Sequence, residues 1–186
     1  MTLRSWFVQL ASAATFAFGT TTPGVTAEEN LSAPFRWSCG APIQGPAARA
    51  NDRCFSVKDP TIVRHGDRWH LFTTIRSEKR THQIEYSSFA EWREAASAPR
   101  HILTFNAGYF CAPQVFYFTP HRKWYLLHQA SDPARPVALQ PAFVTNENIE
   151  NPEGWSRPTF LFEKHPGNVK AWIDFWVICD DDKAHL

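Results

Sequence analysis

Apolar and polar positions alternate over short runs along most of this chain, a pattern that is typical of β-strands. Two stretches, residues 57–75 and 112–130, each read as a strand, a short turn and a second strand. A third stretch, residues 171–186, begins in the same way. Helical spacing is confined to residues 89–98, which is enough for one or two helical turns. We therefore predict an all-β fold.

The three stretches align on one another as a repeat. Aligning them places Asp59, Gln114 and Asp174 at equivalent positions, in steps of 55 and 60 residues. Trp69 and Trp124 each follow ten residues later and open the second strand. A repeat of this size built from strand pairs suggests the blades of a β-propeller, and the alternative is three unrelated hairpins of a β-sandwich.

In a propeller the first strand of each blade lines the central channel, so the three aligned polar side chains would face one pocket. Asp174 stands in the apolar run 172–178, which reads as a buried strand, and a buried carboxylate is costly unless its charge is used. Two carboxylates and an amide around one pocket suit glycoside hydrolysis, whose transition state resembles an oxocarbenium ion. The alternatives are an ion-paired Asp174 and, for Asp59 before Pro60, an ordinary turn.

Residues 1–27 have the layout of a secretory signal peptide. A basic residue, Arg4, precedes an apolar stretch over residues 6–19, and small residues lead up to a cleavage site after Ala27. The alternative is a membrane anchor, but the apolar stretch is shorter than the roughly 20 residues of a spanning helix. We expect a secreted protein that has no membrane association once the leader is removed.

The expected mature chain, residues 28–186, has no excess of either charge. Without Arg4 it carries 18 basic and 18 acidic side chains, and no basic stripe marks a nucleic-acid partner. Aromatic residues make up 15% of the chain, which favours a sugar-binding surface, although much of this content belongs in a core.

The cysteines match no zinc-binding spacing, and in an exported protein they can form disulfides. Sequence allows three complete pairings, of which a bridge between the first two closes the shortest loop and is favoured. The last two are then expected to be free, buried thiols. The four residues are Cys39, Cys54, Cys111 and Cys179.

Seven short motifs, in order along the chain, resemble those of glycoside hydrolase family 62, the α-L-arabinofuranosidases that remove arabinose side chains from arabinoxylan. The resemblance runs from about Phe35 to the last residue. The motifs are FRWS (35–38), SVKDP (56–60), RWHLF (68–72), APQVFYF (112–118), KWYL (123–126), NPEGWSRP (151–158) and WIDFWVICDD (172–181).

This resemblance implies a five-bladed β-propeller and an inverting mechanism. It implies that Asp59 is the general base and that Asp174 is a second carboxylate that orients the general acid and tunes its pKa. Lys58 and Gln114 match positions that line the arabinose pocket. In an inverting pair the two carboxyl groups stand roughly 6.5–9.5 Å apart, with room for a water molecule between them.

The general acid implied by the resemblance is a Glu in a blade beyond the WIDFW motif, and no Glu of residues 28–186 has a matching context. We therefore expect the chain to hold about three of the five blades, as a truncated domain without its acid. The resemblance implies no required cofactor, a structural calcium ion in the complete fold, and a monomer when complete. For the acidic run 180–182, a solvated turn is favoured over a calcium site.

Tyr109 and Trp172 lie close in sequence to the expected site and are the candidates for stacking on a sugar ring. The segment 108–111 reads GlyTyrPheCys where the family has a Gly-Tyr-Arg-like segment, so one polar contact near the pocket is expected to differ. The sequence is also compatible with two other functions. One is a related five-bladed furanosidase or xylosidase, and the other is an inactive remnant that binds sugar.

Overall fold

The structure is a computed structural model that describes residues 36–135 and 139–186, so the predicted leader and the domain start at residue 28 lie outside it. The chain divides into two units, Met1–Gly40 and Ala41–Leu186. Residues 36–40 of the first unit contain no helix or strand. Every element below belongs to the second unit, and none of the described helices is long and apolar enough to cross a membrane.

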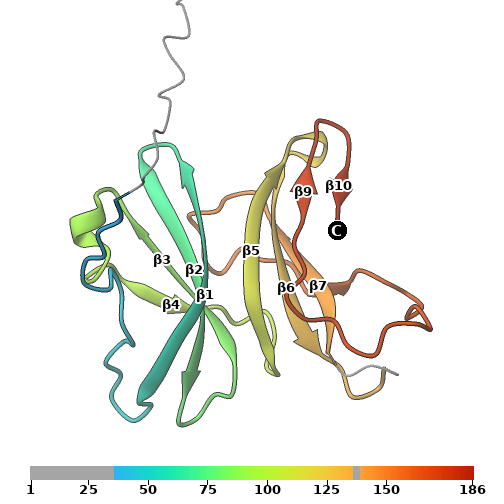
Figure 1. The fold of residues 1–186 in the computed structure, drawn as a ribbon, viewed down its shortest axis with the longest axis horizontal. Coiled ribbons are helices and arrows are strands. Elements are labelled where there is room, and N and C mark those ends of the chain that lie inside the picture. The colour runs from blue at the N-terminus through green and yellow to red at the C-terminus, as the bar shows by residue number, and fades with distance from the viewer. Residues whose placement is uncertain (1–35, 136–138) are drawn as a thin grey trace, which may run out of the picture. The chain divides into compact units, whose positions relative to one another are not determined.

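The first sheet of this unit is a four-stranded antiparallel meander in which each strand pairs with the next one along the chain (Figure 1). A single 3₁₀ turn between its last two strands is the helical turn predicted over residues 89–98. The elements are β1 (Cys54–His65), β2 (Arg68–Ser77), β3 (Gln83–Phe89), η1 (Trp92–Glu94) and β4 (Arg100–Ile102).

The second sheet repeats this arrangement with the strand order β5-β6-β7-β8. Each sheet is a four-stranded meander, the form of a propeller blade. The predicted hairpins over residues 57–75 and 112–130 are the first two strands of the two sheets. The elements are β5 (Phe110–Phe118), η2 (Thr119–His121), β6 (Lys123–Ser131), β7 (Leu139–Asn146) and β8 (Thr159–Phe160).

The third repeat forms only a two-residue hairpin, β9 (Ile178–Cys179) with β10 (Ala184–His185). The predicted buried strand over residues 172–178 is wrong, because all but its last residue is irregular and Asp174 is exposed. Apolar side chains in the run are exposed as well, including Trp176 at 59%. An apolar run predicts burial only where a second layer covers it, and the described residues cover this one incompletely.

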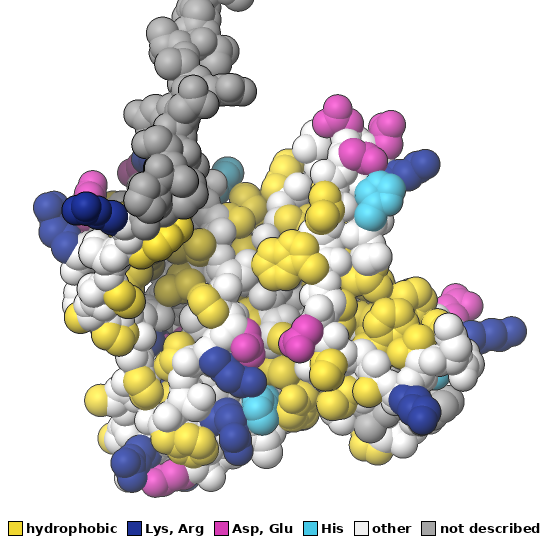
Figure 2. All heavy atoms as spheres, in the orientation of Figure 1, with side chains coloured by type: hydrophobic (Ala, Val, Ile, Leu, Met, Phe, Trp, Pro, Cys, Tyr) yellow, Lys and Arg dark blue, Asp and Glu magenta, His cyan; other side chains and the backbone are white. Residues whose placement is uncertain are grey.

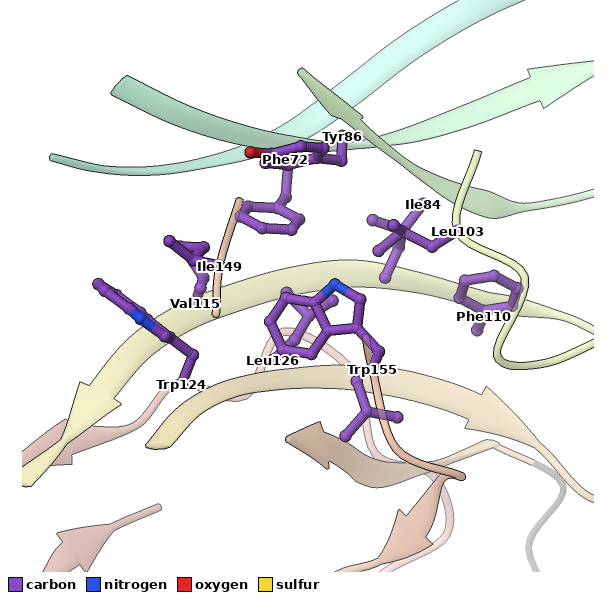
Figure 3. Packing of buried hydrophobic residues seen from close by; sticks show 11 residues of the cluster. Phe72, Ile84, Tyr86, Leu103, Phe110, Val115, Trp124, Leu126, Ile149 and Trp155 are labelled. Carbon is purple, nitrogen blue, oxygen red and sulfur yellow. The ribbon is translucent and has the colours of Figure 1, made fainter. Parts of the chain in front are cut away.

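The core lies between the two sheets (Figure 3). Side chains alternate between the faces of a strand, so every second residue of β2, β3, β6 and β7 points into this layer. Two side chains from the loop after β7, Ile149 and Trp155, complete it. Its buried members are Phe72, Ile84, Tyr86, Leu103, Phe110, Val115, Trp124, Leu126, Val144, Ile149 and Trp155.

All four cysteines are free, so the favoured bridge between Cys39 and Cys54 is wrong. Cys54 and Cys111 are buried, whereas Cys39 and Cys179 are exposed. The expected burial of the Cys179 thiol is therefore wrong, since its two-residue strand β9 is exposed. The Cys54 thiol donates to the backbone oxygen of Ser56 at 3.5 Å. Loop length in the sequence does not report which way each side chain points, and here one partner points into the fold.

Candidate active site

The backbone of β1 is interrupted at Asp59. Pairing with β2 shifts between Lys58 and Thr61, so that Asp59 and Pro60 together lie opposite one residue. Asp59 has a φ of 51°, in the left-handed region, which Asp tolerates better than most residues. Such bulges re-aim a side chain and collect beside active sites.

The second sheet has the same interruption. In β5 the pairing with β6 shifts between Cys111 and Gln114, and the two unmatched residues are Ala112 and Pro113. Ala112 has a φ of 52°. The backbone therefore makes Ala112 the equivalent of Asp59, at a step of 53 residues.

The predicted equivalence of Gln114 with Asp59 is consequently wrong by two residues. Trp69 and Trp124 are equivalent, as predicted, but the turn before Trp124 is two residues longer than the turn before Trp69. The predicted alignment is therefore correct for the strands that follow the turn and off by two residues for the strands that precede it. Gln114 corresponds instead to Thr61.

The third repeat also has a left-handed residue, Asp174, with a φ of 55°. The left-handed residues Asp59, Ala112 and Asp174 all line one cavity of about 200 Å³. Figure 2 shows one face of the molecule, with acidic side chains near its centre among hydrophobic ones. The structure thus brings together three of the predicted site residues. The cavity is lined by Asp59, Pro60, Ala112, Pro113, Gln114, Asp174, Phe175 and Trp176.

Lys58 forms an ion pair with Asp59, with 3.4 Å between Nζ and Oδ2. Both side chains are partly exposed, at 48% and 35%, so the Asp59 carboxylate is open to water. Lys58 does not line the cavity of Asp59. It lines a neighbouring hollow of about 340 Å³, beside Ile62 and Leu71.

Tyr109 is not among the residues that line the cavity. Its ring is 4.6 Å from that of His82, and its hydroxyl oxygen accepts a hydrogen bond from the Cys111 thiol at 3.3 Å. Burial raises the pKa of the Tyr109 hydroxyl, with Cys111 and Asp59 adding to the effect, so the phenol stays protonated. Its stacking on a sugar stays a prediction.

Trp172 is also not among the lining residues. Its ring stacks on that of Phe162, with 5.0 Å between the ring centroids. The tryptophan that does line the cavity is Trp176, which is not one of the predicted site residues. The signal that identifies it is the spacing from the left-handed residue: Trp176 stands two residues after Asp174, as the cavity residue Gln114 stands two residues after Ala112.

Gln114 reaches the loop of the third repeat. Its Nε2 donates to the backbone oxygen of Val177 and its Oε1 accepts from the Val177 amide, both at 2.6 Å. A second glutamine, Gln129 on β6, donates from Nε2 to the backbone oxygen of Trp172 at 3.1 Å. These bonds bracket Asp174.

The described residues contain no cluster of three or more His, Cys, Asp or Glu side chains that could hold a metal ion. In the acidic run 180–182, the Asp180 carboxylate accepts from the amides of Asp182 and Lys183 at 2.9 and 2.7 Å and pairs with His185. The His185 contact and the two amides lower the pKa of Asp180 to about 2. The run is an exposed turn, and the Asp180 carboxylate is already engaged by these partners.

Comparisons with known proteins identify the family of this chain. The sequence model of glycosyl hydrolase family 62 matches residues 37–186. The α-L-arabinofuranosidase C of Cellvibrio japonicus (strain Ueda107) is 36% identical over 166 residues, which are 89% of this chain and 24% of that protein. Hydrolases of this family need no cofactor.

Solved structures indicate the same family. The catalytic domain of the GH62 α-L-arabinofuranosidase of Coprinopsis cinerea has a TM-score of 0.69 and 37% identity, over 78% of this chain and 46% of that one. An α-L-arabinofuranosidase of Podospora anserina in complex with cellotriose has a TM-score of 0.61 and 33% identity, over 74% and 44%. A GH62 hydrolase in complex with xylotriose has a TM-score of 0.60 and 32% identity, over 75% and 44%.

The chain therefore spans less than half the length of each of these proteins. The predicted all-β fold, with part of a five-bladed propeller, is confirmed. A family match over residues 37–186, together with these relatives, shows that the chain belongs to glycosyl hydrolase family 62.

Proposed function

We propose that this chain forms the part of an exported, inverting α-L-arabinofuranosidase that binds arabinose side chains of arabinoxylan and carries the general base. The carrying observation is that Asp59 and Asp174 line one cavity in a family 62 chain. The relative from Cellvibrio japonicus is named as an α-L-arabinofuranosidase, and a GH62 hydrolase has been solved with xylotriose, a piece of a xylan main chain. Both support the proposed substrate.

In this proposal Asp59 takes a proton from water while the water oxygen attacks the anomeric carbon of arabinose. The bond to the xylan oxygen breaks on the opposite face, which inverts the configuration. The open position of Asp59 gives water access, and the bulge aims its side chain into the cavity. The Asp174 carboxylate favours the positive charge that develops on the sugar ring.

Departure of the xylan oxygen also requires a proton from a general acid. Among the described residues, Asp59 and Asp174 are the acidic side chains lining the cavity, and no Glu is among them. We infer that the acid comes from outside the described residues. A leaving group that is itself a weak base needs no such proton, so an aryl glycoside tests the remaining machinery alone.

The test is hydrolysis of 4-nitrophenyl α-L-arabinofuranoside by the full chain. We expect release of 4-nitrophenol, inverted arabinose as the first product by NMR, and a kcat/KM about 100- to 10,000-fold lower for Asp59→Asn. The matched control is Asp67→Asn, an exposed aspartate in the β1–β2 turn, which should hydrolyse normally.

Three outcomes would overturn this function. Binding of arabinose-bearing xylo-oligosaccharides without hydrolysis would make the chain a sugar-binding protein. Faster hydrolysis of the matching xyloside would make it a related xylosidase. Equal rates for Asp59→Asn and the wild-type chain would remove Asp59 from the mechanism.

Export is part of the same proposal and rests on the sequence of residues 1–27, which lie outside the described residues. The measurement is N-terminal sequencing of the protein recovered from the culture medium of its own host. A chain beginning at Glu28 is expected, and a cell-retained chain that still begins at Met1 would contradict secretion.

A further inference from the structure

Asp174 is placed by its backbone and not by contacts of its own side chain. Within residues 36–135 and 139–186 no hydrogen bond or ion pair reaches its carboxylate, and the residue is exposed. It adopts a left-handed conformation in an irregular segment. Whatever fixes the backbone on either side therefore fixes the direction of the carboxylate.

Two buried glutamines from the second sheet supply that fixing. Gln114 on β5 is 6% exposed, and its amide engages both the N–H and the C=O of Val177, three residues after Asp174. Gln129 on β6 is also buried and binds the C=O of Trp172, two residues before it. The loop is held at both ends by side chains that belong to ordered strands.

The first sheet holds the equivalent loop of the second sheet in the same way. Thr61, the counterpart of Gln114, accepts the Val115 amide at 3.3 Å, and Val115 is three residues after Ala112. Thr74, the counterpart of Gln129 in the register, accepts the Ala112 amide at 2.8 Å. The same two positions of a sheet thus hold the left-handed loop of the next repeat.

We propose that Gln114 and Gln129 are positioning residues for Asp174, holding its carboxylate at the cavity wall. The inference rests on the function proposed above for Asp174. It gives Gln114 a role different from the expected direct contact with arabinose, because both heteroatoms of its amide are already bonded to Val177. A loop freed at either end lets the carboxylate drift, and misplacement by about 1 Å can cost about 100-fold in rate.

The test uses methionine, which matches glutamine in length and removes its hydrogen bonds. Gln114→Met and Gln129→Met should each lower kcat for the aryl arabinofuranoside by about 10- to 100-fold, with KM nearly unchanged. In an Asp174→Asn background the same substitutions should have little further effect, because no carboxylate remains to be positioned. Gln114→Glu, which keeps the acceptor for the Val177 amide, should recover part of kcat.

The matched control is Gln140→Met, since Gln140 is a buried glutamine of the same sheet that binds Arg135, away from the cavity. It should leave kcat unchanged. A rise in KM for Gln114→Met, or a full effect that persists without the Asp174 carboxylate, would assign direct sugar contact and overturn positioning. A fall in kcat for Gln140→Met equal to that for Gln114→Met would reduce the effect to general destabilisation.

Hydrogen exchange separates this inference from the proposed function. If positioning is correct, Gln114→Met accelerates exchange of the Val177 amide about 10-fold or more, whether or not the wild-type chain hydrolyses anything. Unchanged exchange would overturn the inference by itself. If the wild-type chain is inactive but Gln114→Met still accelerates exchange of the Val177 amide, Gln114 anchors the loop and only the proposed function is refuted.

Discussion

The two four-stranded sheets carry irregular segments on the faces that point away from their shared core, and these segments are anchored by opposite chemistry. On the first sheet, Glu85 is 1% exposed and binds Arg100 at 2.8 Å and Arg49, which lies in the irregular segment before β1. On the second sheet, the segment that carries Asp174 is held by the neutral amides of Gln114 and Gln129. One anchor is a buried charge cluster and the other is uncharged.

This difference separates stability from reactivity. A buried ion cluster is costly to disrupt because the remaining charges lose their partners. Amides supply directional bonds without a net charge, so they hold the loop without altering the field around Asp59 and Asp174. We expect changes on the first sheet to act on the whole fold and changes on the second to act on the cavity.

The largest effect expected is that of Glu85→Ala. Removing the carboxylate leaves Arg49 and Arg100 without their buried partner, which should cost about 3–5 kcal/mol of the free energy of unfolding. The melting temperature should fall by about 10 °C, measured by circular dichroism. Glu78→Ala, at an exposed glutamate just after β2, is the control and should change it little. Equal melting temperatures for the two variants would show that the charge cluster contributes no stability.

Acid should act through the core that both sheets share. His128 is fully buried beside Phe105 and Phe110, and burial lowers its pKa to about 4 from 6.5. The unfolded chain therefore takes up a proton at a higher pH than the folded chain does. The contribution of neutral His128 to stability is therefore fully present above pH 6.5. The free energy of unfolding falls by about 3 kcal/mol as the pH drops to 4.

Urea denaturation between pH 4 and pH 7 measures this loss. His128→Phe suits the surrounding rings and should flatten the pH dependence, although it removes the hydrogen bond between Nδ1 and the Leu126 oxygen. His70, whose pKa burial also lowers, should account for a remaining slope. An unchanged slope in His128→Phe would show that the acid sensitivity originates elsewhere.

Much of this arrangement could be predicted from the sequence because it rests on period-two patterning. The hairpins over residues 57–75 and 112–130 fold as expected, and Asp59, Gln114 and Asp174 do meet at one cavity. The repeat could be recognised because Trp69 and Trp124 mark the same place in each sheet.

The remaining features depend on geometry that short patterns do not encode. A bulge leaves only a faint trace in sequence, here the Pro that follows both Asp59 and Ala112. Aligning polar side chains therefore paired Asp59 with Gln114, two residues beyond its true counterpart. The exposure of Asp174 depends on what covers its segment. The place of Trp176 in the cavity follows only once the bulges are aligned.

The loops of Ala112 and Asp174 allow a finer comparison, because one is held by threonine hydroxyls and the other by glutamines. Thr74 is fully buried, and Thr74→Val keeps its shape while removing the acceptor of the Ala112 amide. We expect a loss of about 1–3 kcal/mol in urea denaturation, the cost of a buried donor without a partner. Thr104→Val, at an exposed threonine, is the control. Equal stability of Thr74→Val and the wild-type chain would mean that the hydrogen bond between the Ala112 amide and Thr74 contributes no stability.

The smallest effect distinguishes the two residues at the centres of these loops. Ala112 gains nothing from its left-handed conformation, which costs an ordinary residue about 1–2 kcal/mol, whereas Asp accepts that conformation more readily. Ala112→Gly should relieve this strain against a loss of about 0.5–1 kcal/mol in chain entropy, giving a net gain of up to about 1 kcal/mol. Asp174→Gly has less strain to relieve and should be neutral or slightly destabilising. If the urea midpoints of both variants move in the same direction by the same amount, the two loops are equally strained. Asp174 would then tolerate the left-handed conformation no better than Ala112 does.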